Sequence, residues 1–217
     1  MKQINIKTII ATALLTIFMV SCTDILEEQP RSIFEPGFFK SEQGVKGGLT
    51  SLYAHLRYIY GNAYFYNSGV TGTDEATYAQ SADGNFKVMD ISGQGNITST
   101  ATGGTGTLWD NAFPAINTAS GIIENATVVG LNASLIAEAR FFRAFDYFML
   151  VQTFGGVPLD LGAGELKFNT SPVRVSVRNT VPEVYTKAIF PDLVAAVNDL
   201  PDAGRLTGTV TKNVARL

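Results

Sequence analysis

The sequence predicts an all-α fold, in which antiparallel helices form pairs that are separated by long irregular loops. Four stretches carry apolar residues at a spacing of three and four positions: 44–60, 108–127, 133–154 and 181–200. Turn-forming residues bound these stretches, and no convincing set of segments alternates as strands do. Helices joined in pairs are typical of an α-solenoid of the tetratricopeptide-like kind, although no repeat of fixed period is visible.

The N-terminus has the three-part layout of a signal peptide. Two lysines precede an uncharged apolar run from Ile9 to Val20, and Ser21 stands directly before Cys22. The run is much shorter than the roughly 20 residues that a membrane-spanning helix needs. We therefore predict a signal peptide over residues 1–21 and lipid attachment at Cys22, which would anchor the protein to a membrane. The alternative is a plain secretory signal with a cysteine just after the cut.

Residues 22–43 are predicted to form a lipidated, extended tether. Pro30 and Pro36 interrupt this segment, and its first residues are acidic. The acidic start is either an address for the outer leaflet of the outer membrane or an ordinary solvated linker.

The first predicted helix spans residues 44–60, with Ser41 as its N-cap and Gly61 as its end. Its apolar stripe is predicted to comprise Leu49, Leu52, Tyr53, Leu56 and Tyr60. His55 falls off this stripe, so we expect a surface residue or a residue with satisfied hydrogen bonds rather than a ligand.

Residues 61–108 show no repeating apolar face and are predicted to form a long loop. Aromatic residues mix with turn formers at first, and Ser92–Thr107 is then dominated by Gly, Ser and Thr. Loops of this length in a compact domain are usually functional or disordered. The glycines do not complete a dinucleotide fingerprint, because no strand precedes them and no acidic residue follows at the right distance.

Two helices follow this loop. In 108–127, Pro114 is expected to kink the helix or to mark its true start. Residues 133–154 are apolar around the whole helix axis, which is typical of a buried helix. Because buried charges must be paired, we predict that Arg143 and either Glu138 or Asp146 belong to structural ion pairs.

The C-terminal third is predicted to be a connector followed by two helices. The connector spans residues 159–180. Thr180 and Glu183 fit a capping box that opens the next helix, and Pro191 is expected to bend this helix. A final helix is expected to begin at Thr211.

Composition excludes several functional classes. Without the two lysines of the signal peptide, 14 basic and 19 acidic residues remain, so nucleic acid is not an expected partner. One His and one Cys cannot form a cluster of transition-metal ligands, and we expect no metal and no cofactor. No nucleophile, base and orienting group assemble in the sequence, so catalysis is not expected.

Three blocks of sequence carry a family resemblance. The first is CTDILEEQP at Cys22–Pro30, a cysteine followed by an acidic arm. The second is AEARFFRAFDYFMLVQTFGGVPL at Ala137–Leu159, a long helix with a Gly-Gly-x-Pro exit. The third is LPDAGRLTGTVTKNVARL at Leu200–Leu217, a Gly-Arg turn that leads into a helix. Together they resemble the SusD/RagB family of nutrient-binding outer-membrane lipoproteins of Bacteroidetes.

The resemblance implies a cell-surface protein that binds an oligosaccharide or a peptide and delivers it to a SusC-like TonB-dependent transporter. It also implies that residues 44–217 are the N-terminal part of a longer helical domain, which ends here within a helix. Two alternatives stay open. One is a truncated helical scaffold or remnant that binds nothing, and the other is a surface glycoside hydrolase or protease.

The long loop supplies the candidate ligand-binding residues. Sugars are bound by stacking on aromatic faces and by hydrogen bonds to carboxylates. The main candidates are Asp74, Glu75, Tyr78 and Phe86, and Tyr64 and Tyr66 belong to the same loop. Packing within the loop is the alternative role for each of them. Adjacent residues usually point apart, which argues against Asp74 and Glu75 as the paired acids of a glycosidase.

Overall fold

The computed structural model describes residues 36–61, 73–75, 105–171 and 176–217 of the chain. These residues form an all-α fold, as the sequence predicted. The longer helices are α2 (Glu42–Tyr60), α5 (Thr105–Val128), α6 (Ala133–Phe154) and α8 (Phe190–Asp199). The shorter elements are η1 (Pro36–Lys40), α7 (Val181–Val184), the π-helical η2 (Tyr185–Ile189) and α9 (Lys212–Arg216). In this part of the chain, the only β pairing is a single bridge between Asp160 and Glu165.

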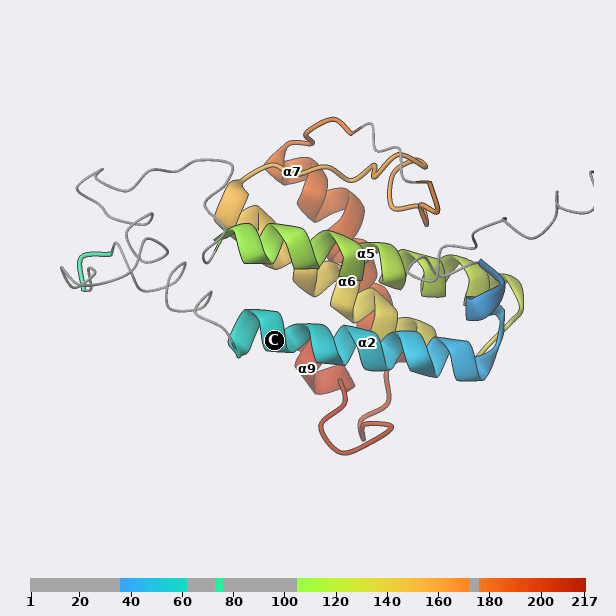
Figure 1. Cartoon of the computed structure of the whole chain (residues 1–217). Coiled ribbons are helices and arrows are strands. Elements are labelled where there is room, and N and C mark those ends of the chain that lie inside the picture. The colour runs from blue at the N-terminus through green and yellow to red at the C-terminus, as the bar shows by residue number, and fades with distance from the viewer. Residues whose placement is uncertain (1–35, 62–72, 76–104, 172–175) are drawn as a thin grey trace, which may run out of the picture. The chain divides into compact units, whose positions relative to one another are not determined.

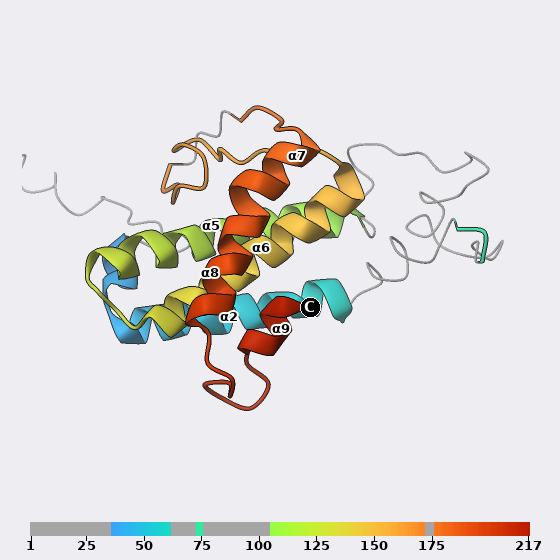
Figure 2. The ribbon, with the colours of Figure 1, turned by 180° about the vertical axis from the view of Figure 1, so that it is seen from behind.

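The long helices are arranged as antiparallel neighbours (Figures 1 and 2). Helix α5 packs on α2 and on α6, and α8 crosses α6. The C-terminal end of α2, the N-terminal end of α5 and the C-terminal end of α6 therefore lie at the same end of the helices. We call this the loop-bearing end, because the chain leaves α2 and enters α5 there.

The buried apolar residues form two clusters along the helices. The first joins η1, most of α2, the second half of α5 and the first half of α6 to the end of α8 and to α9. The second, near the loop-bearing end, joins Ile59, the first half of α5, the second half of α6 and the elements that follow it. Each long helix thus contributes to both clusters or links them, which favours cooperative folding of this region.

Phe39 is buried between α2 and α5, where two glycines provide its space. A Cβ at Gly48 would lie 2.8 Å from the Phe39 ring, and one at Gly121 would lie 2.7 Å from it. The ring also packs edge-to-face on Phe168, at a centroid distance of 5.7 Å. The prediction of an extended tether to residue 43 was therefore wrong at its end, because residues from Pro36 onward are helical and Phe39 is part of the core.

Ser41 is the N-cap of α2, as predicted. Its hydroxyl oxygen accepts a hydrogen bond from the Gly44 amide at 3.1 Å. The predicted apolar stripe was wrong at its last position. Ile59 is buried, whereas Tyr60 is largely exposed. Each residue turns a helix by about 100°, so a residue seven positions after Leu52 points in nearly the same direction as Leu52. That residue is Ile59, whereas Tyr60 points about 100° further round the helix.

Pro114 and Pro191 lie well inside longer helical segments. Helix α5 begins at Thr105 and continues through Pro114, so the helix does not start at this proline. Pro191 follows the π-helical turn η2, in which the Phe190 amide donates to the Tyr185 carbonyl five residues earlier. A proline has no amide hydrogen to continue the regular pattern, and the turn before Pro191 departs from α-helical hydrogen bonding.

The connector between α6 and α7 is held against α5. The Asn117 side-chain Nδ2 donates to the Asn169 backbone carbonyl at 2.9 Å, and the Asn117 side-chain Oδ1 accepts from the Asn169 backbone amide at 2.8 Å. The Glu124 carboxylate accepts a hydrogen bond from the Phe168 amide at 3.2 Å. Among the described residues, no helix is both long enough and apolar enough to cross a membrane.

Candidate functional site

The predicted ligand-binding residues are only partly within the described region. Asp74 and Glu75 lie in an exposed bend of residues 73–75, where the Glu75 amide donates to the Thr73 hydroxyl at 3.3 Å. Tyr78 and Phe86 lie outside the described residues, as do Tyr64, Tyr66 and the predicted lipid site Cys22. These residues therefore stay candidates from the sequence alone.

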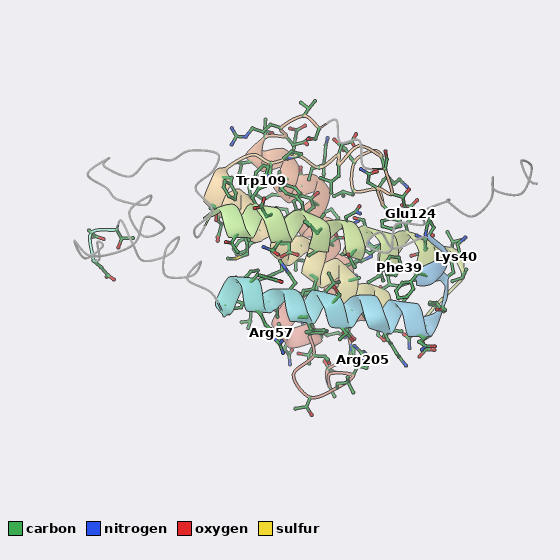
Figure 3. The ribbon with its side chains drawn as sticks, in the orientation of Figure 1. Phe39, Lys40, Arg57, Trp109, Glu124 and Arg205 are labelled. Carbon is green, nitrogen blue, oxygen red and sulfur yellow. The ribbon has the colours of Figure 1, made fainter. Side chains whose placement is uncertain are left out.

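Trp109 begins an aromatic group at the loop-bearing end (Figure 3). Its ring lies edge-to-face on Phe113 of the same helix, at 4.8 Å, and on Phe154 at the end of α6, at 5.1 Å. Trp109 is nevertheless 39% exposed. Nearby, Arg178 donates to the carbonyl oxygens of Phe154 and Gly156, each at 2.7 Å. The indole thus packs on the ring of Phe154, and the guanidinium binds the backbone at the same end of α6.

A second aromatic group lies on the opposite side of α6. Phe145 stacks on Phe141 with centroids 6.1 Å apart, and it also contacts Tyr60 of α2 at 6.4 Å. Phe145 and Phe154 are nine positions apart. At about 100° per residue, their side chains leave the helix in roughly opposite directions. The two aromatic groups therefore belong to different surfaces of the loop-bearing end.

The polar residues of α6 are placed by contacts with other elements. Arg143 is buried, and its Nε and Nη2 donate to the two oxygens of Asp192 on α8 at 2.6 and 2.9 Å. Its Nη1 donates to the Ser120 hydroxyl of α5 and to the Leu166 carbonyl of the connector, both at 3.1 Å. Arg140 adds another donor to Asp192 at 2.8 Å. This arginine network joins α5, α6, α8 and the connector.

Glu138 forms a second buried network, which holds the turn between α8 and α9. Arg205 donates to both oxygens of the Glu138 carboxylate, at 2.9 and 3.2 Å, and this contact raises the pKa of Arg205. The Tyr53 hydroxyl donates to Glu138 at 2.9 Å and accepts from the Val210 amide at 2.8 Å. Burial is the main cause of a raised pKa for Tyr53. Figure 3 shows Arg205 on this turn, beside α2.

Asp146 forms a third buried contact, which links α6 to α2. His55 Nε2 lies 2.9 Å from Asp146 Oδ1, and both side chains are buried. Asp146 Oδ2 has no hydrogen-bond partner. Burial raises the pKa of Asp146, and the contact with His55 acts in the opposite direction.

The three charged residues singled out from the sequence thus all have partners, and each partner lies on another element. Arg143 pairs with Asp192, Glu138 with Arg205, and Asp146 contacts His55. Neither Glu138 nor Asp146 is the partner of Arg143. The sequence predicted Tyr53 as part of the apolar stripe and Arg205 as part of a Gly-Arg turn, but their polar contacts and the roles of Asp192 and Arg178 were missed, because the partners lie far away along the chain. The Arg143 and Glu138 networks satisfy buried charges, which is a structural role, whereas the contact with His55 satisfies only one oxygen of Asp146.

Comparison with known proteins identifies the family. A family described as starch-binding and associating with the outer membrane matches residues 24–215. The chain belongs to the SusD-like family. The match covers most of the chain, including η1 and all the described helices up to residue 215 in α9, and it confirms the resemblance seen in the sequence.

Two curated relatives come from Formosa agariphila. SusD-like protein P2 is 28% identical over 220 residues, which covers 93% of this chain and 39% of the relative. SusD-like protein P25 is 26% identical over 167 residues, which covers 71% of this chain and 31% of the relative. The chain therefore spans about a third of the length of the curated SusD-like relatives that it matches.

Solved structures share the SusD-like helical fold. A SusD superfamily protein from Bacteroides thetaiotaomicron has a TM-score of 0.63 and 20% identity, and the match covers 82% of this chain and 42% of the other. A protein described as a laminarin-binding SusD-like protein has a TM-score of 0.62 and 22% identity, with 81% and 38% coverage. At such identities the similarity establishes the fold alone.

Proposed function

We propose that this chain is part of a cell-surface lipoprotein that binds glycans and delivers them to a SusC-like TonB-dependent transporter. The observation that carries the proposal is the family match over residues 24–215, to a family described as starch-binding and associated with the outer membrane. A relative in fold is described as binding laminarin, which is also a polysaccharide. A glycan is therefore favoured over a peptide as the ligand.

The proposed anchor is a lipid on Cys22. The preceding run has the charge, length and small residue expected of a signal peptide. A lipid on the cysteine would hold the protein at the outer membrane without a spanning helix. Because acyl chains rather than protein make this attachment, removal of one thiol should abolish it.

The anchor can be tested by expressing the full chain in a Bacteroidetes host together with its Cys22→Ser variant. We expect the wild-type protein to incorporate a labelled fatty acid, to fractionate with the outer membrane and to be cleaved by protease added to intact cells. The Cys22→Ser variant should incorporate no label and should leave the membrane fraction. Labelling that persists in the variant would contradict attachment at Cys22.

The binding role calls for calorimetric titration with maltoheptaose, a starch fragment, and laminarihexaose, a laminarin fragment. We expect saturable binding of at least one oligosaccharide and no release of shorter products. Affinity purification of the tagged protein from membranes should also recover a TonB-dependent transporter. Shortened products would favour the hydrolase alternative, and a protein without glycan or transporter would favour the scaffold alternative.

A further inference from the structure

The aromatic group around Trp109 has the chemistry of a sugar-contacting site. We propose that Trp109, Phe154 and Arg178 form a glycan contact on the helical part of the protein, separate from the loop candidates Asp74 and Glu75. This inference rests on the proposed function, because it assumes that the ligand is a glycan. It adds a location that the sequence analysis did not single out.

The indole of Trp109 is held rigidly. Trp109 is held by edge-to-face contacts with Phe113 at 4.8 Å and with Phe154 at 5.1 Å, so two helices fix its plane. A side chain that is already ordered loses little conformational entropy when a ligand stacks on it. With 39% of the residue exposed, an apolar face of a sugar ring can still reach it.

A charged side chain is held on the backbone of Phe154, the residue whose ring packs on Trp109. Arg178 is exposed, and its Nε and Nη2 donate to the Gly156 and Phe154 carbonyl oxygens. The guanidinium is therefore fixed on the same residue, Phe154, that packs on Trp109. A guanidinium has five N–H donors in a rigid plane, so further donors remain for sugar hydroxyls. An exposed ring for stacking and oriented donors for hydroxyl groups are the two kinds of group that sugar recognition uses.

The aromatic group lies where two long helices begin and end. Trp109 lies in the first turns of α5, and Phe154 is the last residue of α6, so the group sits at the loop-bearing end. Figure 3 shows Trp109 at this end of α5. Other exposed aromatic residues, such as Phe190 on α8, lie on a different element and lack a fixed guanidinium contact among the interactions described above.

The experiment uses the fact that Trp109 is the only tryptophan of the chain. Its fluorescence therefore reports on this group alone. We expect a saturable change in the emission when maltoheptaose or laminarihexaose is added to the full chain. The midpoint should agree with the calorimetric Kd for the same sugar.

Variants separate stacking from folding. Trp109→Phe keeps a ring for packing and should weaken calorimetric binding about threefold, whereas Trp109→Ala should weaken it about threefold to tenfold. Phe190→Ala is the matched control, because it removes an exposed ring on α8 and should leave the Kd unchanged. Circular dichroism of each variant shows whether the helices are intact.

The outcomes distinguish this inference from the proposed function. Saturable calorimetric binding with unchanged Trp109 emission, and with an unchanged Kd in Trp109→Phe, would overturn the Trp109 contact and leave glycan binding in place. If neither oligosaccharide shows calorimetric binding, both the Trp109 contact and the proposed glycan binding would be overturned. A change in emission that saturates in the wild type, with weaker binding in folded Trp109→Phe, supports the inference.

Discussion

Two buried aspartates, Asp146 on α6 and Asp192 on α8, have sharply different surroundings. Asp192 accepts three hydrogen bonds from Arg140 and Arg143, so both of its oxygens have charged donors. Asp146 is equally buried, but it contacts only His55 and leaves Oδ2 without a partner. Burial alone therefore says little about what a carboxylate contributes to stability.

The comparison shows why the partners decide the outcome. A buried carboxylate loses its hydration, and only charged donors in good geometry compensate for that loss. Arg143 provides this compensation for Asp192 and at the same time satisfies Ser120 and the Leu166 carbonyl. The contacts of α6 with α8 should therefore be stabilised by the charge of Asp192, whereas at the contact with α2 the charge of Asp146 should cost stability.

The largest effect is expected for Asp192→Asn. The amide nitrogen would place a donor against a guanidinium donor and would leave two arginines without a counter-charge. We expect a loss of about 3–5 kcal/mol in the free energy of unfolding, measured by urea denaturation of the full chain. A loss below about 1 kcal/mol would mean that the arginine network does not stabilise the fold, which would remove the basis of the comparison.

A smaller effect is expected for Glu138→Gln, which keeps the shape of the side chain but removes the charge that faces Arg205. We expect a loss of about 1–3 kcal/mol in the free energy of unfolding, because a buried hydrogen bond to a charged group is weakened. Hydrogen exchange of the Val210 amide should accelerate, since this amide donates to the Tyr53 hydroxyl of the same network. Tyr53→Phe is the control, because it removes that acceptor and should accelerate exchange at Val210 while Arg205 keeps its partner.

The sequence was sufficient to predict the helices where local signals agree. Helix α6 spans residues 133–154 as predicted, because Asn132 accepts a hydrogen bond from the Ser134 amide and Gly155 adopts a positive φ of 72° at its end. Tyr60 was misplaced, since a helical stripe read from spacing alone tolerates an error of one position. Phe39 was missed, because its pocket is made by Gly48 and Gly121 on two other segments.

The partners of the charged residues could not be predicted, although the need for partners could. Arg143 and Asp192 are 49 positions apart, Glu138 and Arg205 are 67 apart, and His55 and Asp146 are 91 apart. Such pairs depend on which helix faces meet, and periodicity does not contain that information. The ligand candidates Tyr78 and Phe86 lie outside the described residues, so the sequence remains their only support.

A still smaller effect, with a distinct dependence on pH, is expected for Asp146→Asn. Because burial raises the folded-state pKa of Asp146 above 3.8, its protonated form stabilises the fold at low pH. This contribution is complete below the unfolded pKa and is lost as the pH rises through the folded pKa. The wild type should therefore lose stability relative to Asp146→Asn as the pH rises above 3.8, as measured by urea denaturation between pH 4 and pH 8.

Asp192→Asn and Asp146→Asn make the same chemical change, but their effects on stability should depend differently on pH. Asp192→Asn should destabilise the protein throughout this pH range, because its arginines stay charged. Stability curves of wild type and Asp146→Asn that run parallel in pH would show that Asp146 titrates alike in the folded and unfolded states.

The smallest effect is expected for an ion pair at the surface. Lys187 contacts Glu165 at 2.8 Å and Glu183 at 3.5 Å, with all three side chains more than 40% exposed. Water and salt screen such contacts, so Lys187→Ala should leave the urea midpoint unchanged within error, at low salt as well as at high salt. A large, salt-dependent loss in Lys187→Ala would mean that the connector depends on its surface charges. In that case the number of charged partners, rather than their burial, would separate the stabilising contacts from the neutral ones.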